Sequence, residues 1–238
     1  FLVDSQLTNL ELRGEYYPGR GSTFSVAGFY KDIQNPIEAF SSFSDNSQLT
    51  RFANAPSATL YGVELDLQHR FDLMDMGGFF ASKELLVFAN YTWTQSEIKV
   101  GPDDVTRVFP SADAPATNFF RDGVPLTGQS DHLANLQISL EDVDRLQQVT
   151  VLVNYASERV TSRGTAGLPD IVENPGFTLD LVMRQGLSLM GLESELKLEA
   201  RNILGRDNFE YQTDGTQRVE INSYAVGTTI SASLSVDF

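Results

Sequence analysis

Arginine and aromatic side chains in the polar segments of the chain are the residues best suited to chemistry, and that chemistry is ligand binding. Rings and guanidinium groups on long exposed loops are common binding anchors. They serve equally well to pack one loop on another. The candidate ligand contacts are Arg51, Phe52, Arg107, Phe109, Phe119, Phe120, Arg121 and Tyr211.

Catalytic chemistry has little support in the sequence. No Gly-x-Ser-x-Gly elbow, His-Glu-x-x-His pair, phosphate-binding glycine loop or sustained Asp-x-Asp ladder is present. Solvated turns explain the acidic pairs Asp103-Asp104 and Asp142-x-Asp144, and His69 and His132 are isolated. The chain also lacks cysteine, which excludes a disulfide framework, a thiolate metal site and a cysteine nucleophile. We therefore expect no enzyme, no cofactor and no metal. Outer-membrane barrels can carry a Ser/His hydrolase site, but no motif of this chain specifically supports one.

Composition narrows the class of partner. The formal net charge is −15, whereas a nucleic-acid binder needs a basic face to displace phosphate counterions, so we expect no nucleic-acid partner. At 238 residues, the chain could hold one large all-β unit or two small domains. It contains no run of 18 or more apolar residues, so the sequence predicts no transmembrane helix.

The elements that must position the candidate residues are ribbons in which apolar and polar residues alternate. Successive side chains of a strand point to opposite faces, so each of these segments has one apolar face and one polar face. The clearest ribbon runs from Ser223 to Phe238, and its apolar face ends on the aromatic terminal residue. Its length suits a transmembrane strand of about 9–11 residues better than the 5–6 residues usual in soluble domains. Counting this one, we predict nine strands.

The connections between these ribbons alternate in length. Segments 18–22, 72–83, 141–146 and 185–192 are short or moderate, whereas 34–57, 98–128, 158–176 and 203–222 are long. Outer-membrane barrels keep short turns at the periplasmic end and long loops outside. With that orientation, aromatic residues gather near both ends of the apolar face, as two membrane-interface girdles would require. The pattern predicts an all-β, antiparallel up-and-down transmembrane β-barrel segment, with mixed charges on the lumen face forming structural ladders.

Several short motifs resemble one known family. Phe29-Tyr30-Lys31-Asp32-Ile33 with Asn35-Pro36-Ile37, and then Leu60-Tyr61-Gly62-Val63-Glu64, look like strand-edge motifs of TonB-dependent outer-membrane receptors of Gram-negative bacteria. Leu196 to Ala200 followed by Arg201-Asn202-Ile203-Leu204-Gly205 is similar to the family's penultimate strand. Tyr224, Gly227 and Phe238 match the family's terminal strand, which the barrel-assembly machinery reads.

This resemblance implies a 22-stranded barrel filled by a plug domain, with a TonB box that couples the plug to the inner-membrane energy complex. Residues 1–238 would form the C-terminal portion of that barrel, without the plug and the preceding strands. Nine strands leave two open edges that lipid cannot satisfy, so we expect a fragment of a longer protein. The implied partners are outer-membrane lipid and lipopolysaccharide, the TonB complex through the missing plug region, and a small-molecule ligand.

The function that follows is uptake of a scarce extracellular ligand in the outer membrane by TonB-coupled active transport. Iron chelated by a siderophore, cobalamin and a saccharide all remain open as the ligand. Two alternatives share part of the pattern. A passive porin has the same ribbons but no plug, and a soluble β-sandwich binding module would bury its apolar faces between two sheets.

Overall fold

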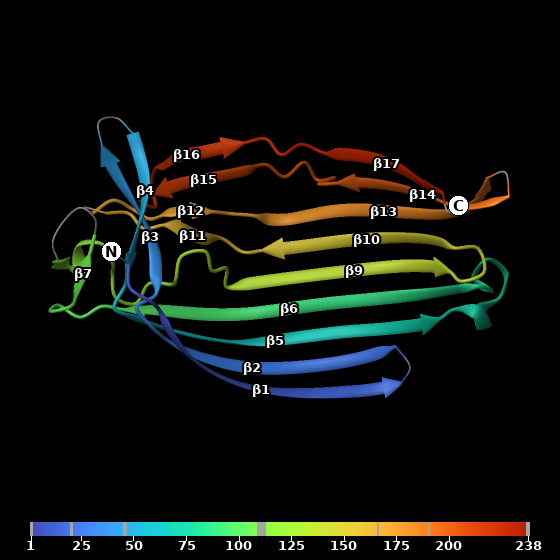
Figure 1. Cartoon of the computed structure of the whole chain (residues 1–238), viewed down its shortest axis with the longest axis horizontal. Helices are drawn as coiled ribbons and strands as arrows, with labels where there is room; N and C mark the ends of the chain where they lie inside the picture. Colours follow the sequence, from blue (N-terminus) through green and yellow to red (C-terminus); the bar gives the residue numbers. More distant parts are fainter. Residues whose placement is uncertain are drawn as a thin grey trace.

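One long antiparallel sheet of nine strands dominates the computed structural model (Figure 1). The structure describes residues 2–19, 21–44, 47–108, 113–165, 167–189 and 191–236. Each strand of this sheet pairs with the sheet's next strand along the chain, which confirms the predicted up-and-down order of nine strands. The strands are β1 (Gln6–Gly19), β2 (Ser22–Gln34), β5 (Ser57–Asp72), β6 (Lys83–Lys99), β9 (His132–Asp142), β10 (Gln147–Ala156), β13 (Gly176–Leu189), β14 (Leu192–Arg201) and β17 (Thr229–Val236).

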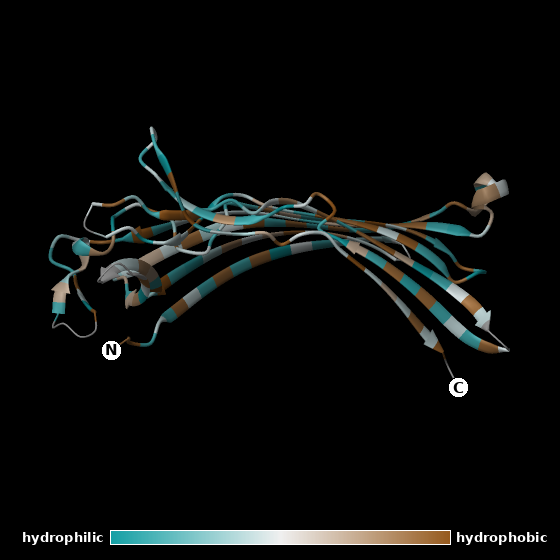
Figure 2. Cartoon of the chain, turned by 90° about the horizontal axis from the view of Figure 1, so that it is seen from above, coloured by the Kyte–Doolittle hydropathy of each residue, from teal (hydrophilic) through white to brown (hydrophobic). Residues whose placement is uncertain are grey.

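The sheet has one aliphatic face and one polar face, because apolar residues alternate with polar ones and stay in register across strands. Leu65 on β5 lies opposite Val26 on β2 and Tyr91 on β6, so all three share the aliphatic face. Figure 2 shows this alternation as brown and teal bands along the strands of an arched sheet. Leu65 is 46% exposed, and among the described strands no second sheet stacks on this face. The sheet therefore lacks the dry centre of a β-sandwich.

The polar face carries the predicted charge ladder. The Arg13 guanidinium lies 3.2 Å from Glu11, 3.5 Å from Glu64 and 3.6 Å from Asp66. Asp66 also accepts a hydrogen bond from Asn90 Nδ2 at 2.9 Å. These residues sit on β1, β5 and β6 at one level of the sheet, where the single positive charge of Arg13 lies close to three carboxylates.

A close approach on the polar face explains one glycine of the strand-edge motif. A Cβ on Gly62 would lie 2.3 Å from the backbone oxygen of Trp93 and 2.6 Å from Cζ of Phe29, the residue opposite it on β2. The Phe29 ring thus occupies the space of the missing side chain, and Lys31 Nζ lies 5.3 Å from the centre of that ring. An aromatic residue on the polar face is accommodated in this way.

The long connections, expected as loops, contain short strands. They hold β3 (Ile37–Ser44) with β4 (Ser47–Asn54), β7 (Val105–Arg107) with β8 (Asp113–Pro115), β11 (Arg159–Ser162) with β12 (Ile171–Glu173), β15 (Asn208–Thr213) with β16 (Arg218–Tyr224), and the 3-10 turn η3 (Ala116–Asn118). The strands β11, β12, β15 and β16 join into a four-stranded sheet. All of these labelled strands lie at one end of the molecule, and the short connections lie at the other (Figure 1).

The short connection between β5 and β6 contains two further 3-10 turns, η1 (Met74–Met76) and η2 (Gly78–Phe80). Among the described residues, no helix combines the length and the apolar character required to cross a membrane.

The last ribbon differs from its prediction. An unbroken strand over 223–238 was expected, but the structure ends β16 at Tyr224 and begins β17 at Thr229. Between them Gly227 has a φ of 70°, and the left-handed Asn202 donates a hydrogen bond from Nδ2 to its carbonyl oxygen at 2.9 Å. Thr228 Oγ1 donates to the carbonyl oxygen of Asn202 at 2.9 Å. These side-chain bonds bend the backbone, and sequence alternation cannot reveal them.

Candidate ligand-binding site at the loop end

Two of the long connections, 34–57 and 98–128, pack onto the polar face of the sheet. Ile33, Ala58 and Ile98 lie side by side on β2, β5 and β6, at the loop end of that face. They contact a cluster that includes the buried side chains of Phe40 from β3 and Phe120, which follows η3. These two connections therefore fold toward the polar side of the sheet.

A buried arginine ties three of these connections together. Arg163, at 1% exposure, follows β11 and donates from Nε and Nη2 to Glu38 Oε2 on β3, at 3.2 and 3.0 Å. Its Nη1 donates to Asp170 Oδ2 at 3.1 Å, and its Nη2 also donates to the carbonyl oxygen of Pro125. A guanidinium with fixed planar donors suits this convergence of acceptors. We call Glu38, Arg121, Arg163 and Asp170 the charge clamp.

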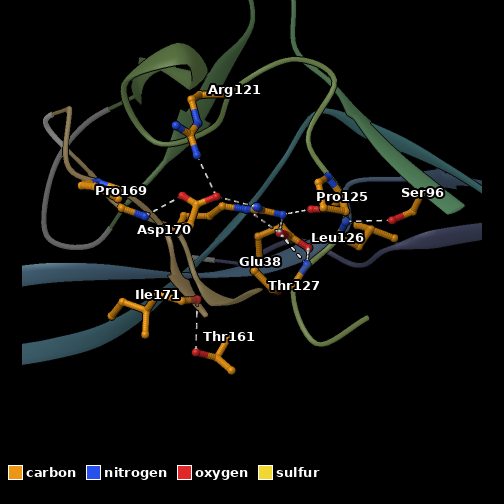
Figure 3. Close-up of polar contacts among 12 residues, drawn as sticks. Glu38, Ser96, Arg121, Pro125, Leu126, Thr127, Thr161, Pro169, Asp170 and Ile171 are labelled. Atoms are coloured by element: carbon orange, nitrogen blue, oxygen red, sulfur yellow. Dashed lines mark hydrogen bonds and ion pairs between the residues drawn. The ribbon is translucent and has the colours of Figure 1, made fainter. Parts of the chain in front are cut away.

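Backbone donors complete the charge clamp. Both carboxylate oxygens of Glu38 accept from the backbone N–H of Thr127 at 3.1 Å. Asp170 accepts from the N–H of Gly164 at 2.9 Å and pairs with Arg121 Nη2 at 2.7 Å. Figure 3 shows Glu38, Asp170 and Arg121 converging from separate segments of the chain. Each buried charge thus has an opposite charge and further hydrogen bonds, which buried ion pairs require.

The members of the charge clamp differ in burial, and burial changes the pKa of one of them. Burial raises the pKa of Glu38 above the ordinary glutamate value, although the neighbouring Arg163 opposes this shift. Arg163 and Glu38 are 1% and 2% exposed at their side chains, whereas the Arg121 side chain is 59% exposed. Of the four members, Arg121 is therefore the charge that a ligand in solvent can reach.

Two of the predicted contacts are buried. Phe120 is 1% exposed in the loop core, and Tyr211 on β15 is 9% exposed. The Tyr211 hydroxyl donates to Glu158, and the Arg218 guanidinium stacks 3.7 Å from the centre of its ring. Burial, and then the hydrogen bond to Glu158, raises the pKa of Tyr211. In the described structure, both side chains pack the loops.

The remaining predicted contacts lie nearer the surface. Phe52 on β4 is 55% exposed, and Arg107 forms an exposed ion pair with Asp113 at 2.9 Å. Phe119 is half-buried, with its ring 5.2 Å from that of Phe40, and Arg51 on β4 is half-buried opposite Phe40. Phe109 lies outside the described residues. Thus Phe119, Phe120 and Arg121 gather near the charge clamp, whereas Tyr211 belongs to the four-stranded loop sheet. Their part in ligand binding stays a prediction.

Sequence reasoning missed three members of the charge clamp, namely Glu38, Arg163 and Asp170. Glu38 and Arg163 are 125 positions apart in the chain, and each stands alone among polar residues. No spacing rule joins residues at that separation. No group of three or more histidine, aspartate or glutamate side chains suited to a metal occurs in the described ranges.

A hollow of about 460 Å³ on the sheet is lined largely by polar-face side chains. Asp66, Asn90, Asn135, Gln137 and Asn154 contribute carboxylate and amide groups to it. Asn135 Nδ2 donates to Asn90 Oδ1 at 3.0 Å, so these amides form a cross-strand row. This row gives the polar face hydrogen-bonding capacity below the loops.

The fold and the loop end define the wall of a β-barrel: one long up-and-down sheet, a bare aliphatic face, and connections folded toward the polar side. The family model described as "TonB dependent receptor-like, beta-barrel" matches residues 6–203, and the chain belongs to this family. No curated protein and no solved structure gives a significant match to it. Members of the family are receptors and transporters of the Gram-negative outer membrane, not enzymes.

Proposed function

We propose that residues 1–238 form the C-terminal part of the wall of a larger barrel of about 22 strands, with a plug domain and further strands encoded upstream. The free edges of β1 and β17 support this proposal. Lipid offers no partner for the unpaired backbone groups of such edges, and additional strands would supply one. Tyr224 and Gly227, together with Phe238 beyond the described residues, would present β17 to the barrel-assembly machinery.

We propose that the intact protein takes up a scarce ligand, such as siderophore-bound iron, cobalamin or a saccharide, by TonB-coupled active transport. The inward-folded loops and the charge clamp are the observations that support this most. A porin needs an open lumen, whereas a receptor needs a preorganised surface that contacts its ligand. Outer-membrane lipid and lipopolysaccharide would surround the barrel, and the TonB complex would act through the plug.

Exposure ranks the proposed ligand contacts. Phe52 and Arg121 come first, because both are exposed and Arg107, although equally exposed, is paired with Asp113. Arg121 belongs to the charge clamp, and Phe52 lies opposite Ala39, the neighbour of Glu38 on β3. Arg51, Arg107, Phe109 and Phe119 would contact the ligand around them. Phe120 and Tyr211 would act by shaping the loops.

Growth of a strain that lacks the intact gene, with iron, cobalamin or a saccharide limiting in turn, tests the proposal. We expect a growth defect with one ligand class only, and the same defect when TonB is inactivated in the parent strain. Uptake that continues without TonB would indicate a passive porin instead.

Substitutions in the complementing gene then test the site. Arg121→Ala and Phe52→Ala should each weaken ligand affinity roughly tenfold, since a binding anchor contributes about 1–2 kcal/mol. Arg145→Ala is the matched control, because Arg145 is exposed on the short connection at the opposite end of the sheet. Unchanged affinity in both loop variants would remove them from the site.

A further inference from the structure

The short connection between β5 and β6 has an unusual surface. Its two 3-10 turns expose Met76 and Phe79, at 68% and 69%, with Asp75 exposed beside them. Exposed side chains of this size stand at the end of the sheet opposite the ligand loops. Neither the ligand-binding site nor barrel closure accounts for them.

The position of Phe79 fixes the side of the sheet on which this connection lies. Lys83 is two residues before Leu85, so both side chains point to the aliphatic face. Lys83 Nζ lies 4.3 Å from the centre of the Phe79 ring. The connection therefore folds back toward the aliphatic side. Figure 2 agrees: the coiled turn at the right-hand end lies on the convex side of the arched sheet.

Local contacts hold the connection in place. Lys83 pairs with Asp142 at 2.7 Å, and their side chains are 10% and 2% exposed. The ring of Phe79 adds a cation–π contact to this buried pair. The backbone N–H of Leu73 donates to the carbonyl oxygen of Lys83 at 3.1 Å, and that of Val143 donates to Ser82 at 3.0 Å. Phe79 is thus positioned before any partner arrives.

We infer that residues 73–81 form an interfacial anchor that inserts Met76 and Phe79 at the boundary between headgroups and acyl chains of the periplasmic leaflet. The partner is a phospholipid surface. We choose phospholipid because this connection is continuous with the aliphatic face. The Lys83–Asp142 pair is followed on the same face by the pair Leu85 and Leu140, where the aliphatic band begins. Apolar side chains beside polar ones bind such interfaces through buried apolar area. The inference rests on the proposed membrane placement of the aliphatic face.

Spin labels can measure the depth of this segment in the intact receptor, reconstituted in bilayers of phosphatidylethanolamine and phosphatidylglycerol. Because the chain has no cysteine, Phe79→Cys and Met76→Cys each give one label on it. Leu65→Cys on the aliphatic face reports the acyl region. Asp144→Cys, exposed on the next short connection, reports water. The readout is collision of each label with oxygen, which concentrates in lipid, against collision with a water-soluble nickel chelate.

We expect the labels at 76 and 79 to favour oxygen over nickel several-fold more than the label at 144 does. Equal ratios at 76, 79 and 144, with Leu65 still in lipid, would overturn the anchor while leaving the membrane placement intact. Labels at 76 and 79 shielded from both reagents would also overturn it, in favour of a protein partner. A water-exposed label at 65 would reject the membrane placement itself. In the described structure, Lys83 contacts Asp142 and Phe79, so the label at 76 tests the anchor without removing either partner of the ion pair.

Discussion

At the scale of single residues, the charge clamp shows how a polar loop region can be rigid. Arg163 has carboxylates on both sides and a carbonyl oxygen as a further acceptor, so its buried charge is compensated. Removing one partner of a buried pair leaves an uncompensated charge, which costs far more than losing an exposed pair. The buried Arg163–Glu38 pair and the exposed Arg107–Asp113 pair therefore predict very different effects.

Replacing Arg163 with alanine should destabilise the packed loops by about 3–5 kcal/mol, since Glu38 and Asp170 lose their shared counter-charge. Hydrogen exchange of the backbone amides in β3, β11 and β12 measures this effect. Arg107→Ala is the control: its pair with Asp113 is exposed on both sides and should contribute about 1 kcal/mol or less. Similar exchange rates in the two variants would contradict the clamp.

A pH effect is predicted at the tip between β15 and β16. The backbone N–H groups of Gln217 and Thr216 donate to Asp214 at 2.8 Å and lower the pKa of its carboxyl to about 2. A depressed pKa means that the ionised form stabilises the turn above the ordinary value of 3.8, and that this contribution is lost as the pH falls toward 2. Carboxyl carbon shifts of Asp214 in an NMR titration should give that midpoint. A midpoint near 4 would show that the turn is not formed.

At the scale of elements, the alternation of residues predicted the nine long strands but not the four small strand pairs of the long connections. Alternation reports one apolar and one polar face, and the long strands have this property along most of their length. The strands β7, β11 and β12 are only three or four residues long, and polar residues fill the segments around them. They depend on contacts between distant connections, such as the buried core around Phe40 and Phe120.

The aliphatic face gives a direct prediction for β5. Leu65→Arg should destabilise the intact barrel by roughly 2–4 kcal/mol if Leu65 lies near the bilayer midplane. Thr92→Arg is the matched control, because Thr92 lies opposite Glu64 on the polar face, where a positive charge finds a partner. Unfolding in denaturant from lipid bilayers gives both free energies. Equal losses of unfolding free energy in the two variants would mean that the aliphatic and polar faces lie in the same environment.

At the scale of the whole molecule, the sheet is a wall with two unpaired edges. The 14 residues of β1 are exposed throughout, and β17 has a neighbour on one side only. The sequence predicted the wall because every strand repeats the same pattern. It predicted the candidate contacts only by residue type and loop position, so Phe120 and Tyr211 were included although they are buried. Burial in the loops depends on which connections meet, and no local pattern specifies that.

In the proposed orientation the loop end faces the medium, so the charge clamp also affects how antibodies and phages recognise the protein. Glu38 and Asp170 pair with Arg163, and Arg121 pairs with Asp170, so the charge clamp joins three separate stretches of the chain. The carboxylates and Arg163 are buried, but the exposed side chains of the stretches that they join, Arg121 and Phe52 among them, would form a discontinuous epitope for an antibody or a phage. Immunisation with a linear peptide from any single stretch should therefore raise sera that bind the denatured protein well and living cells poorly.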